Sequence, residues 1–372
     1  MKKIFTLAMM SAFALGAMAQ TNGFYHIQNT LTKRYMVLVD NQPGNTDTAG
    51  NIDMEAMNTC LDLDEVSIHP GSIIYIENIS GTAYEVKAQG SSLAQLSGNR
   101  LQAQISSVSD GYTIWGSYGG VTVKLGDMEN KKPRTDDQYQ TWSYVKDGGD
   151  RNSTWKFHSI DNSTHYIGIK PDCQAAGAYW GTMKAGFSFK LHSSGMEAYY
   201  VDAVDNSSFS LKKWDKDVIP ATMPIIIKCS SNDPAKNIIR PVTDSGTEPS
   251  TNWLEGRYFD NGTSHHVNRL AYDSNTMRTI GEEGGKLVFK KASSSDLTDG
   301  AYCVHNKCYL MNLPSSCANT MYESSGTGIE SVMKDSKKAD NAIYTLNGVR
   351  LQQGVTPRPG VYIQNGKKVV IK

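Results

Sequence analysis

The chain has 372 residues, which is enough for about two or three domains of ordinary size. Its 37 basic and 37 acidic residues balance to a net charge of zero, so charge gives no argument for a nucleic acid, an anionic membrane or an acidic substrate as partner. Hydrophobic residues make up 39% and charged residues 20% of the chain, which permits a buried core and argues against wholesale disorder.

The first 19 residues have the pattern of a cleavable secretory signal. Two lysines precede an apolar run over residues 4–14, and a small-residue motif places cleavage between Ala19 and Gln20. The run is shorter than the roughly 20 residues that cross a bilayer core, which disfavours a membrane anchor. We therefore expect a secreted or outer-membrane-surface protein, with the periplasm as the fallback location, and no transmembrane segment in the mature chain.

Residues 20–172 contain four copies of a hairpin pattern. Each copy has an aromatic strand, a turn rich in Gly, Asn or Asp, and a second apolar strand, and the copies cover residues 24–39, 73–88, 112–125 and 155–169. Alternating apolar and polar residues on both sides of such turns predict β-hairpins. The first aromatic residues of the copies recur about every 40 residues, which indicates a repeat architecture. For residues 53–65 the composition allows either a short helix or an acidic loop.

Residues 173–323 contain many short strand patterns with closely spaced turn signals. The clearest are the alternating residues 187–191, a hairpin pattern over 198–211 around Asp205, and strand patterns at 224–228, 287–290 and 301–310. Short strands at this spacing favour a β-sandwich.

The C-terminal part differs from both regions before it. Residues 324–341 are polar, charged and rich in turn formers, which predicts a linker. Residues 342–372 carry two Asn-Gly dipeptides between alternating runs, and this is a strong hairpin signal. We expect a small C-terminal β tail of about four strands.

Six cysteines are present, and an even count in an exported chain permits disulfides without requiring them. Cys303 and Cys308 are the best-placed pair, because the four residues between them could turn a hairpin and set the sulfurs opposite each other. Their spacing differs from the C-x-x-C redox pattern, and no second cysteine pair supplies a zinc site. Structural roles, either free or bridged, are favoured.

Signatures of catalysis are absent from the sequence. It contains no H-E-x-x-H, no G-x-S-x-G and no Walker loop. His265 and His266 form the sharpest polar cluster, and a loop could let them bind a metal with Asp260 or Asp273. Adjacent residues of a strand point to opposite faces, however, so we favour a polar loop and expect no metal and no cofactor.

The hairpin region offers residue types suited to binding a sugar. A sugar needs an aromatic face for its C–H surface and amide or carboxylate groups for its hydroxyls. The candidate ligand-binding residues are Trp115, Trp142, Tyr139, Asp137 and Gln140. The alternative is that Trp115 and Trp142 belong to the core of the domain. Paired carboxylates for a glycosidase cannot be chosen from the sequence alone.

The tail resembles the C-terminal sorting tails of secreted Bacteroidetes-type proteins, although it is shorter than is usual in that family. The matching residues are Tyr344, Leu346, Gly348, Gly360, Val361, Tyr362, Gly366, Lys368 and Ile371. This resemblance implies export through a type IX system or attachment to the cell surface.

Two further regions resemble known families. Residues 198–201 and 218–227 resemble an uncharacterised secreted β-sandwich family of the same bacteria. Residues 20–170 resemble the β-trefoil of ricin-type lectins, and Gln140-Thr141-Trp142 matches the lectin Gln-x-Trp element once. These resemblances imply a trefoil-like domain over 20–172 and a β-sandwich over 173–323.

The sequence as a whole predicts an all-β protein with a trefoil-like N-terminal domain, a β-sandwich and a small C-terminal β tail. Its expected function is that of a secreted or surface-exposed, non-catalytic binding or adhesion protein. Host or dietary glycans, or other cell-surface proteins, are the expected partners, and nucleic acid is not. A structural surface protein without a small ligand, or a hydrolase acting on polysaccharide or peptide, remain the alternatives.

Overall fold

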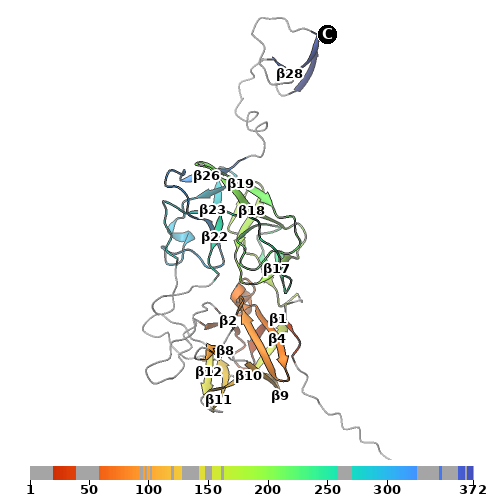
Figure 1. Ribbon diagram of the computed structural model, residues 1–372, viewed down its shortest axis with the longest axis vertical. Coiled ribbons are helices and arrows are strands. Elements are labelled where there is room, and N and C mark those ends of the chain that lie inside the picture. Colours follow the sequence, from red (N-terminus) through yellow and green to blue (C-terminus); the bar gives the residue numbers. More distant parts are fainter. Residues whose placement is uncertain are drawn as a thin grey trace, which may run out of the picture. The chain divides into compact units, whose positions relative to one another are not determined.

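The computed structural model describes most of the chain after the predicted signal (Figure 1). The described residues are 20–38, 58–92, 95–96, 99–100, 103–118, 121–127, 142–146, 153–160, 163–258, 270–324, 343–345, 359–364 and 367–371. They belong to two compact units, Met1–Tyr322 and Glu323–Lys372. The described part is built from β-strands with one short α-helix, α1 (Leu63–Val66), and three 3-10 helices of three residues each, so the predicted all-β class is confirmed. None of its helices is long and apolar enough to cross a bilayer. The predicted signal and most of the predicted linker lie outside the described residues.

The first part of the larger unit is a closed six-stranded antiparallel barrel, in which β13 pairs with both β1 and β10. In ring order its strands are β1 (Gly23–Asn29), β4 (Ile74–Ser80), β5 (Ala83–Ala88), β9 (Ala103–Val108), β10 (Gly111–Tyr118) and β13 (Trp155–Ser159). Three strand pairs lie between barrel strands in the sequence: β2 (Tyr35–Leu38) with β3 (Asn58–Leu61), β7 (Gln95–Leu96) with β8 (Asn99–Arg100), and β11 (Val121–Asp127) with β12 (Trp142–Lys146). A two-residue strand, β6 (Ser91–Ser92), pairs with β5.

The barrel core is built by the alternation of inward and outward side chains along each strand. Alternate residues of a strand point to opposite faces, so one set of apolar side chains fills the inside. Ile74 and Ile76 of β4 are fully buried there, and Trp155 of β13 is 0% exposed. The indole Nε1 of Trp155 donates to the carbonyl of Leu125 at 2.9 Å, so this large side chain is buried with its polar atom satisfied.

Two of the predicted hairpins, β4–β5 and β10–β11, are confirmed, and β1 also pairs with β2. The fourth, over residues 155–169, is wrong. β13 closes the barrel between β1 and β10, so both of its edges are occupied. The second half of the predicted hairpin, β14 (Ile167–Gly168), pairs instead with β21 (Ile238–Val242) of the next region. In the segment 53–65, residues 58–61 form β3 and α1 begins at Leu63.

The second part of the larger unit holds a curled ten-stranded sheet and a three-stranded sheet. In spatial order the large sheet contains β15 (Cys173–Ala175), β16 (Ala178–Met183), β20 (Ile225–Cys229), β18 (Glu197–Val204), β19 (Ser208–Lys213), β26 (Thr320–Glu323), β24 (Lys286–Lys290), β23 (Arg278–Glu283), β25 (Cys308–Leu310) and β22 (Leu254–Gly256). The small sheet has the order β14–β21–β17, with β17 at Ser188–Leu191.

Most strand predictions in this region are confirmed. The predicted hairpin over 198–211 is β18–β19, in which Val201 lies opposite Leu211. The strand patterns at 187–191, 224–228 and 287–290 correspond to β17, β20 and β24. Of residues 301–310, only β25 is a strand of the sheet.

The C-terminal unit contains a three-stranded antiparallel sheet. Its strands are β27 (Ile343–Thr345), β28 (Gly360–Gln364) and β29 (Lys367–Ile371). β28 and β29 pair on either side of the second Asn-Gly dipeptide, as the hairpin signal predicts. The first Asn-Gly dipeptide lies outside the described residues.

Gln89, which follows β5 directly, connects the barrel to the ten-stranded sheet. Its side-chain Oε1 accepts hydrogen bonds from the Gly186 backbone N (3.1 Å) and from Asn306 Nδ2 (3.2 Å). Its Nε2 donates to the carbonyl of Tyr258 at 2.7 Å. The residue is 3% exposed, so these bonds satisfy an amide that water does not reach. We call the contacts of Gln89 with Gly186, Asn306 and Tyr258 the Gln89 junction.

The Gln89 junction requires glycine at position 186. A Cβ atom there would lie 2.0 Å from the carbonyl oxygen of Gln89, far inside van der Waals contact. Backbone rather than a flexible side chain is the obstacle, so one of the two segments would have to shift.

We expect Gly186→Ala to lower the free energy of unfolding by about 2–3 kcal/mol, the usual cost of overpacking a well-packed site. The matched control is Gly177→Ala, where φ is +74° and the added Cβ meets nothing within 4 Å. This control should lose only about 1 kcal/mol of unfolding free energy, because its one penalty is an alanine in a positive-φ conformation. Urea unfolding of both variants measures the difference, and equal losses would contradict the close contact.

Candidate functional site

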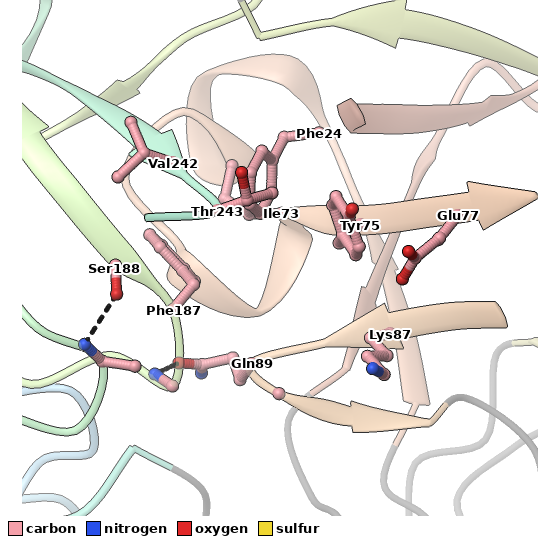
Figure 2. Close-up of a pocket in the computed structure, with 13 residues that line it drawn as sticks. Phe24, Ile73, Tyr75, Glu77, Lys87, Gln89, Phe187, Ser188, Val242 and Thr243 are labelled. Carbon is pink, nitrogen blue, oxygen red and sulfur yellow. Dashed lines mark hydrogen bonds between the residues drawn. The ribbon is translucent and has the colours of Figure 1, made fainter. Parts of the chain in front are cut away.

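A cleft of about 410 Å³ lies where the outer face of the barrel meets the second part of the unit (Figure 2). On the barrel side it is lined by residues of β1, β4 and β5 and their immediate neighbours. On the other side it is lined by residues of β17 and β21, by residues adjoining these strands, and by one residue of the segment before β20. The lining residues are Phe24, Ile73, Tyr75, Glu77, Lys87, Gln89, Gly90, Gly186, Phe187, Ser188, Ala221, Val242 and Thr243.

Strand alternation positions the barrel side of the cleft. Ile74 and Ile76 point into the barrel, so Tyr75 and Glu77 project from the opposite face of β4. The strand register places Phe24 of β1 opposite Tyr75, and Lys87 of β5 opposite it on the other side. Figure 2 shows Tyr75, Glu77 and Lys87 extending from two neighbouring strands toward the same space.

Aromatic rings form much of the apolar wall. The ring centroids of Phe24 and Tyr75 lie 4.9 Å apart with a tilt of 45°, and Phe24 lies 6.4 Å from Phe187 of the second part. These are ordinary separations for packed aromatic pairs. Phe187 is 6% exposed, whereas Phe24 and Tyr75 are half-buried and keep surface toward the cleft.

The polar groups of the cleft carry both signs of charge. Glu77 brings a carboxylate, and the Lys87 ammonium lies 2.9 Å from Oε2 of the neighbouring Glu85. Burial, and then the negative charges of Glu77 and Glu85, raise the pKa of Tyr75. Its phenol therefore stays protonated at neutral pH and can both donate and accept a hydrogen bond.

The cleft has the physical properties of a small-molecule site. Its volume falls within the range usual for such sites, and it combines aromatic walls with a few polar groups. An occupant with one apolar face and several hydroxyl groups would match this lining.

A second cavity of about 320 Å³ contains a histidine pair. Nε2 of His69 lies 3.3 Å from Nε2 of His305, and both side chains line the cavity. His69 also caps the short helix η1 (Pro70–Ser72), since its Nδ1 accepts from the Gly71 backbone N at 3.1 Å. Burial, and then the neighbouring His305, lower the pKa of His69 to about 3.

A second group of histidines lies at the barrel wall. His26 of β1 is 0% exposed, and its ring packs near those of Tyr35 and His165 with centroids 6.0 and 5.8 Å away. His158 stacks on His165 at 4.0 Å. Neither ring nitrogen of His26 has a hydrogen-bond partner among the described residues. Burial, and then the other two histidines, lower the pKa of His26 to about 3.

The sequence-predicted sugar residues are only partly described. Trp115 is a half-buried residue of β10 whose Nε1 donates to the Ser106 hydroxyl at 2.9 Å. The backbone of Trp142 opens β12 opposite Asp127, two strands away from Trp115. Asp137, Tyr139 and Gln140 lie outside the described residues, so their grouping with the tryptophans stays a prediction.

His265, His266 and Asp260 of the predicted polar cluster also lie outside the described residues. Asp273 is described, and its carboxylate accepts from the Asn275 backbone and the Thr276 hydroxyl in a local turn. Within the described ranges, no group of three or more His, Cys, Asp or Glu side chains could hold a metal ion.

Cys303 and Cys308 are free thiols in the structure, which is one of the two structural roles, free or bridged, that the sequence left open. Residues 303–308 make a turn rather than a hairpin, with the Lys307 backbone N donating to Val304 O. Cys308 lies in the core of the ten-stranded sheet, whereas Cys303 packs with Tyr309 in a separate cluster. Burial is the main cause that raises the thiol pKa values, to about 11 for Cys303 and about 12 for Cys308.

Sequence reasoning missed the cleft. Phe24, Tyr75 and Phe187 come from three distant segments, and nothing in the linear pattern shows that they meet. The usable signal was local: Tyr75 and Glu77 occupy the outward positions of a strand with inward Ile residues.

Comparisons with known proteins found no match to this chain among protein-family models, curated proteins or solved structures. The resemblances seen in the sequence therefore stay predictions.

The buried histidines predict that stability falls in acid. Above pH 6.5, His26 is neutral in the folded and unfolded states and adds no pH dependence. Between pH 6.5 and about 3, the unfolded chain binds a proton that the folded state does not, so stability falls by about 1.4 kcal/mol per pH unit for this residue. We expect His26→Phe to reduce this slope in urea unfolding measured from pH 7.5 to 4.5.

The control for this measurement is His192→Gln, a substitution of an exposed histidine of the same unit. It should leave the slope of stability against pH at its wild-type value. A His26→Phe variant with the wild-type slope would contradict the assignment.

Proposed function

We propose that this protein is a secreted or surface-exposed, non-catalytic binding protein whose ligand is a glycan held in the cleft between Phe24, Tyr75 and Phe187. The observation that carries this proposal is the combination of half-buried aromatic rings with Glu77 and Lys87 around one space of about 410 Å³.

The chemistry of a sugar fits this lining. The C–H face of a pyranose ring is apolar and packs on an aromatic face, while its hydroxyls need donors and acceptors at the edge. The ring of Tyr75 offers the face and its hydroxyl, the Glu77 carboxylate accepts, and the Lys87 ammonium donates. All three project from adjacent strands of a closed barrel, a rigid support that limits the entropy lost on binding.

The location and partners follow from the sequence. The signal over residues 1–19, with cleavage at Ala19–Gln20, supports export, and the tail that resembles sorting tails supports a place at the cell surface. Host or dietary glycans are then the accessible ligands, and the glycans of other cell-surface proteins belong to the same class.

We also propose that the barrel is a β-trefoil. Three sequential units, each giving a first and a last strand to the six-stranded barrel and a pair of strands between them, are what a trefoil requires. The strand order supports this, since β2–β3, β7–β8 and β11–β12 each fall between two barrel strands.

A sandwich arrangement is proposed for the second part. One apolar cluster contains Ile167, Phe189 and Ile239 of the small sheet together with Ile225 and Ile227 of the large sheet. Two sheets that share a core in this way support face-to-face packing.

The cleft favours binding over hydrolysis. Of the described residues that line it, Glu77 is the one carboxylate, whereas most glycosidases use two acidic residues on opposite sides of the scissile bond. A purely structural role leaves the half-buried rings of Phe24 and Tyr75 without a reason to border a cavity.

The test is a glycan array on the mature chain, followed by calorimetry with the ligands found. We expect Tyr75→Ala to weaken binding at least about tenfold, because it removes the stacking face, and Glu77→Gln to weaken it less, since an amide still accepts one hydrogen bond. Thermal melts of both variants show whether the barrel is intact.

Trp115→Ala is the matched control, as it removes an aromatic ring from a different barrel strand. It should bind like the wild type if the cleft is the site. If Trp115→Ala lost binding while Tyr75→Ala still bound, the site would lie at the hairpin residues predicted from the sequence. No binding to any glycan at high protein concentration would overturn the proposal.

A further inference from the structure

The histidine pair joins the two parts of the larger unit at a second point. His69 caps η1, next to the barrel strand β4, and His305 lies in the turn that precedes β25 of the ten-stranded sheet. The ring centroids are 5.2 Å apart, and the two Nε2 atoms are within hydrogen-bond distance at 3.3 Å.

The protonation state of His69 follows from its hydrogen bonds. Since Nδ1 of His69 accepts from Gly71 N, its ring proton is on Nε2, which donates to Nε2 of His305. Nε2 of His305 is then the acceptor in this contact. A second proton on His69 would have to lie on Nδ1 and face the Gly71 N–H, so the contact accommodates only the neutral His69 ring.

The described charged residues that line the cavity carry both signs. They are Glu65 of α1, Lys170 after β14 and Lys307, two residues after His305. Lys307 pairs with Asp172 at 2.5 Å. Among the described residues, these charges balance and give no excess of negative charge that would favour an added proton.

The pair is connected to the cleft through one residue. Asn306 follows His305 and lines the histidine cavity, and its Nδ2 donates to Gln89 Oε1 at 3.2 Å and to Lys184 O at 2.8 Å. Gln89 and its partner Gly186 line the cleft. A displacement of His305 therefore acts through Asn306 on Gln89, and through Gln89 on Gly186.

We propose that uptake of a proton by His69 opens its contact with His305, and with it the contact between the barrel and the ten-stranded sheet, and thereby weakens ligand binding in the cleft. The opening depends only on the contacts above, whereas its effect on a ligand rests on the proposed function. By linkage, a ligand that binds the closed form must in turn oppose protonation of His69.

The size of the effect can be estimated. If His69 regains its ordinary pKa of 6.5 in the open form and keeps about 3 in the closed form, acidification from pH 7.5 to 5.0 raises the opening constant about thirty-fold.

Hydrogen exchange measured by mass spectrometry tests the opening without any ligand. At pH 5.0, after correction for intrinsic rates, we expect backbone amides of residues 66–73 and 303–308 to exchange about thirty-fold faster than at pH 7.5. The amides of β4 and β9 should stay protected. The double variant H69Q/H305Q should lose the acid effect, and His192→Gln should keep it.

Three results would overturn the opening. One is equal protection of the two segments at both pH values, and another is the same acid effect in the double variant. The third is a uniform loss of protection over the whole unit, which would indicate global unfolding caused by His26. If the double variant does not fold, histidine C2–H exchange of the wild type decides instead. A pKa at or above 6.5 for His69 would then refute the proposal.

The ligand arm compares Kd at pH 7.5 and 5.0 for a glycan identified on the array. The wild type should bind several-fold more weakly at pH 5.0, and the double variant should bind equally at both. Opening in the exchange data with unchanged Kd would refute the coupling to the cleft. Opening without glycan binding at either pH would refute the proposed function and leave the acid-sensitive contact in place.

Discussion

The arrangement of the larger unit depends on the buried amide of Gln89. A primary amide carries both acceptor and donor atoms, so one side chain satisfies Gly186 N–H, Asn306 Nδ2 and the Tyr258 carbonyl together. Each buried polar group that loses its partner costs about 1–3 kcal/mol, and removing this amide would leave several such groups at once. The close approach of Gly186 to the Gln89 carbonyl fixes the same contact sterically.

This constraint explains how the cleft is built. The barrel is closed, so its interior is filled by apolar residues and only its outer face can take part in binding. That face supplies Phe24, Tyr75, Glu77 and Lys87, and the second part supplies Phe187 and Ser188. Neither part alone encloses the space. The geometry of the site is therefore set by the Gln89 junction as much as by the side chains that would touch a ligand.

The sequence predicted what depends on local patterning. Alternation and turn residues gave the hairpins β4–β5, β10–β11 and β18–β19, because partner strands in each are close in the chain. It failed for β13, whose partners β1 and β10 are distant, since barrel closure is not a local property. The burial of single residues could not be predicted either. Trp155 and Trp115 are both strand tryptophans, yet Trp155 is fully buried and Trp115 is half-buried. Gln89 carries no sequence signal at all.

The two contacts between barrel and ten-stranded sheet differ in one property. The amide of Gln89 does not titrate in the physiological range, so its hydrogen bonds have no pH dependence of their own. The hydrogen bond between His69 and His305 is one that two amides could also make without any proton dependence. Imidazole adds a desolvation cost that appears only in acid, since the pKa of His69 is lowered to about 3. Asn306 follows His305 in the chain and bonds to Gln89 through its side chain. A shift of His305 therefore also affects the hydrogen bonds of Gln89. An imidazole pair at this position thus makes the junction, and with it the cleft, responsive to acid where a pair of amides would not.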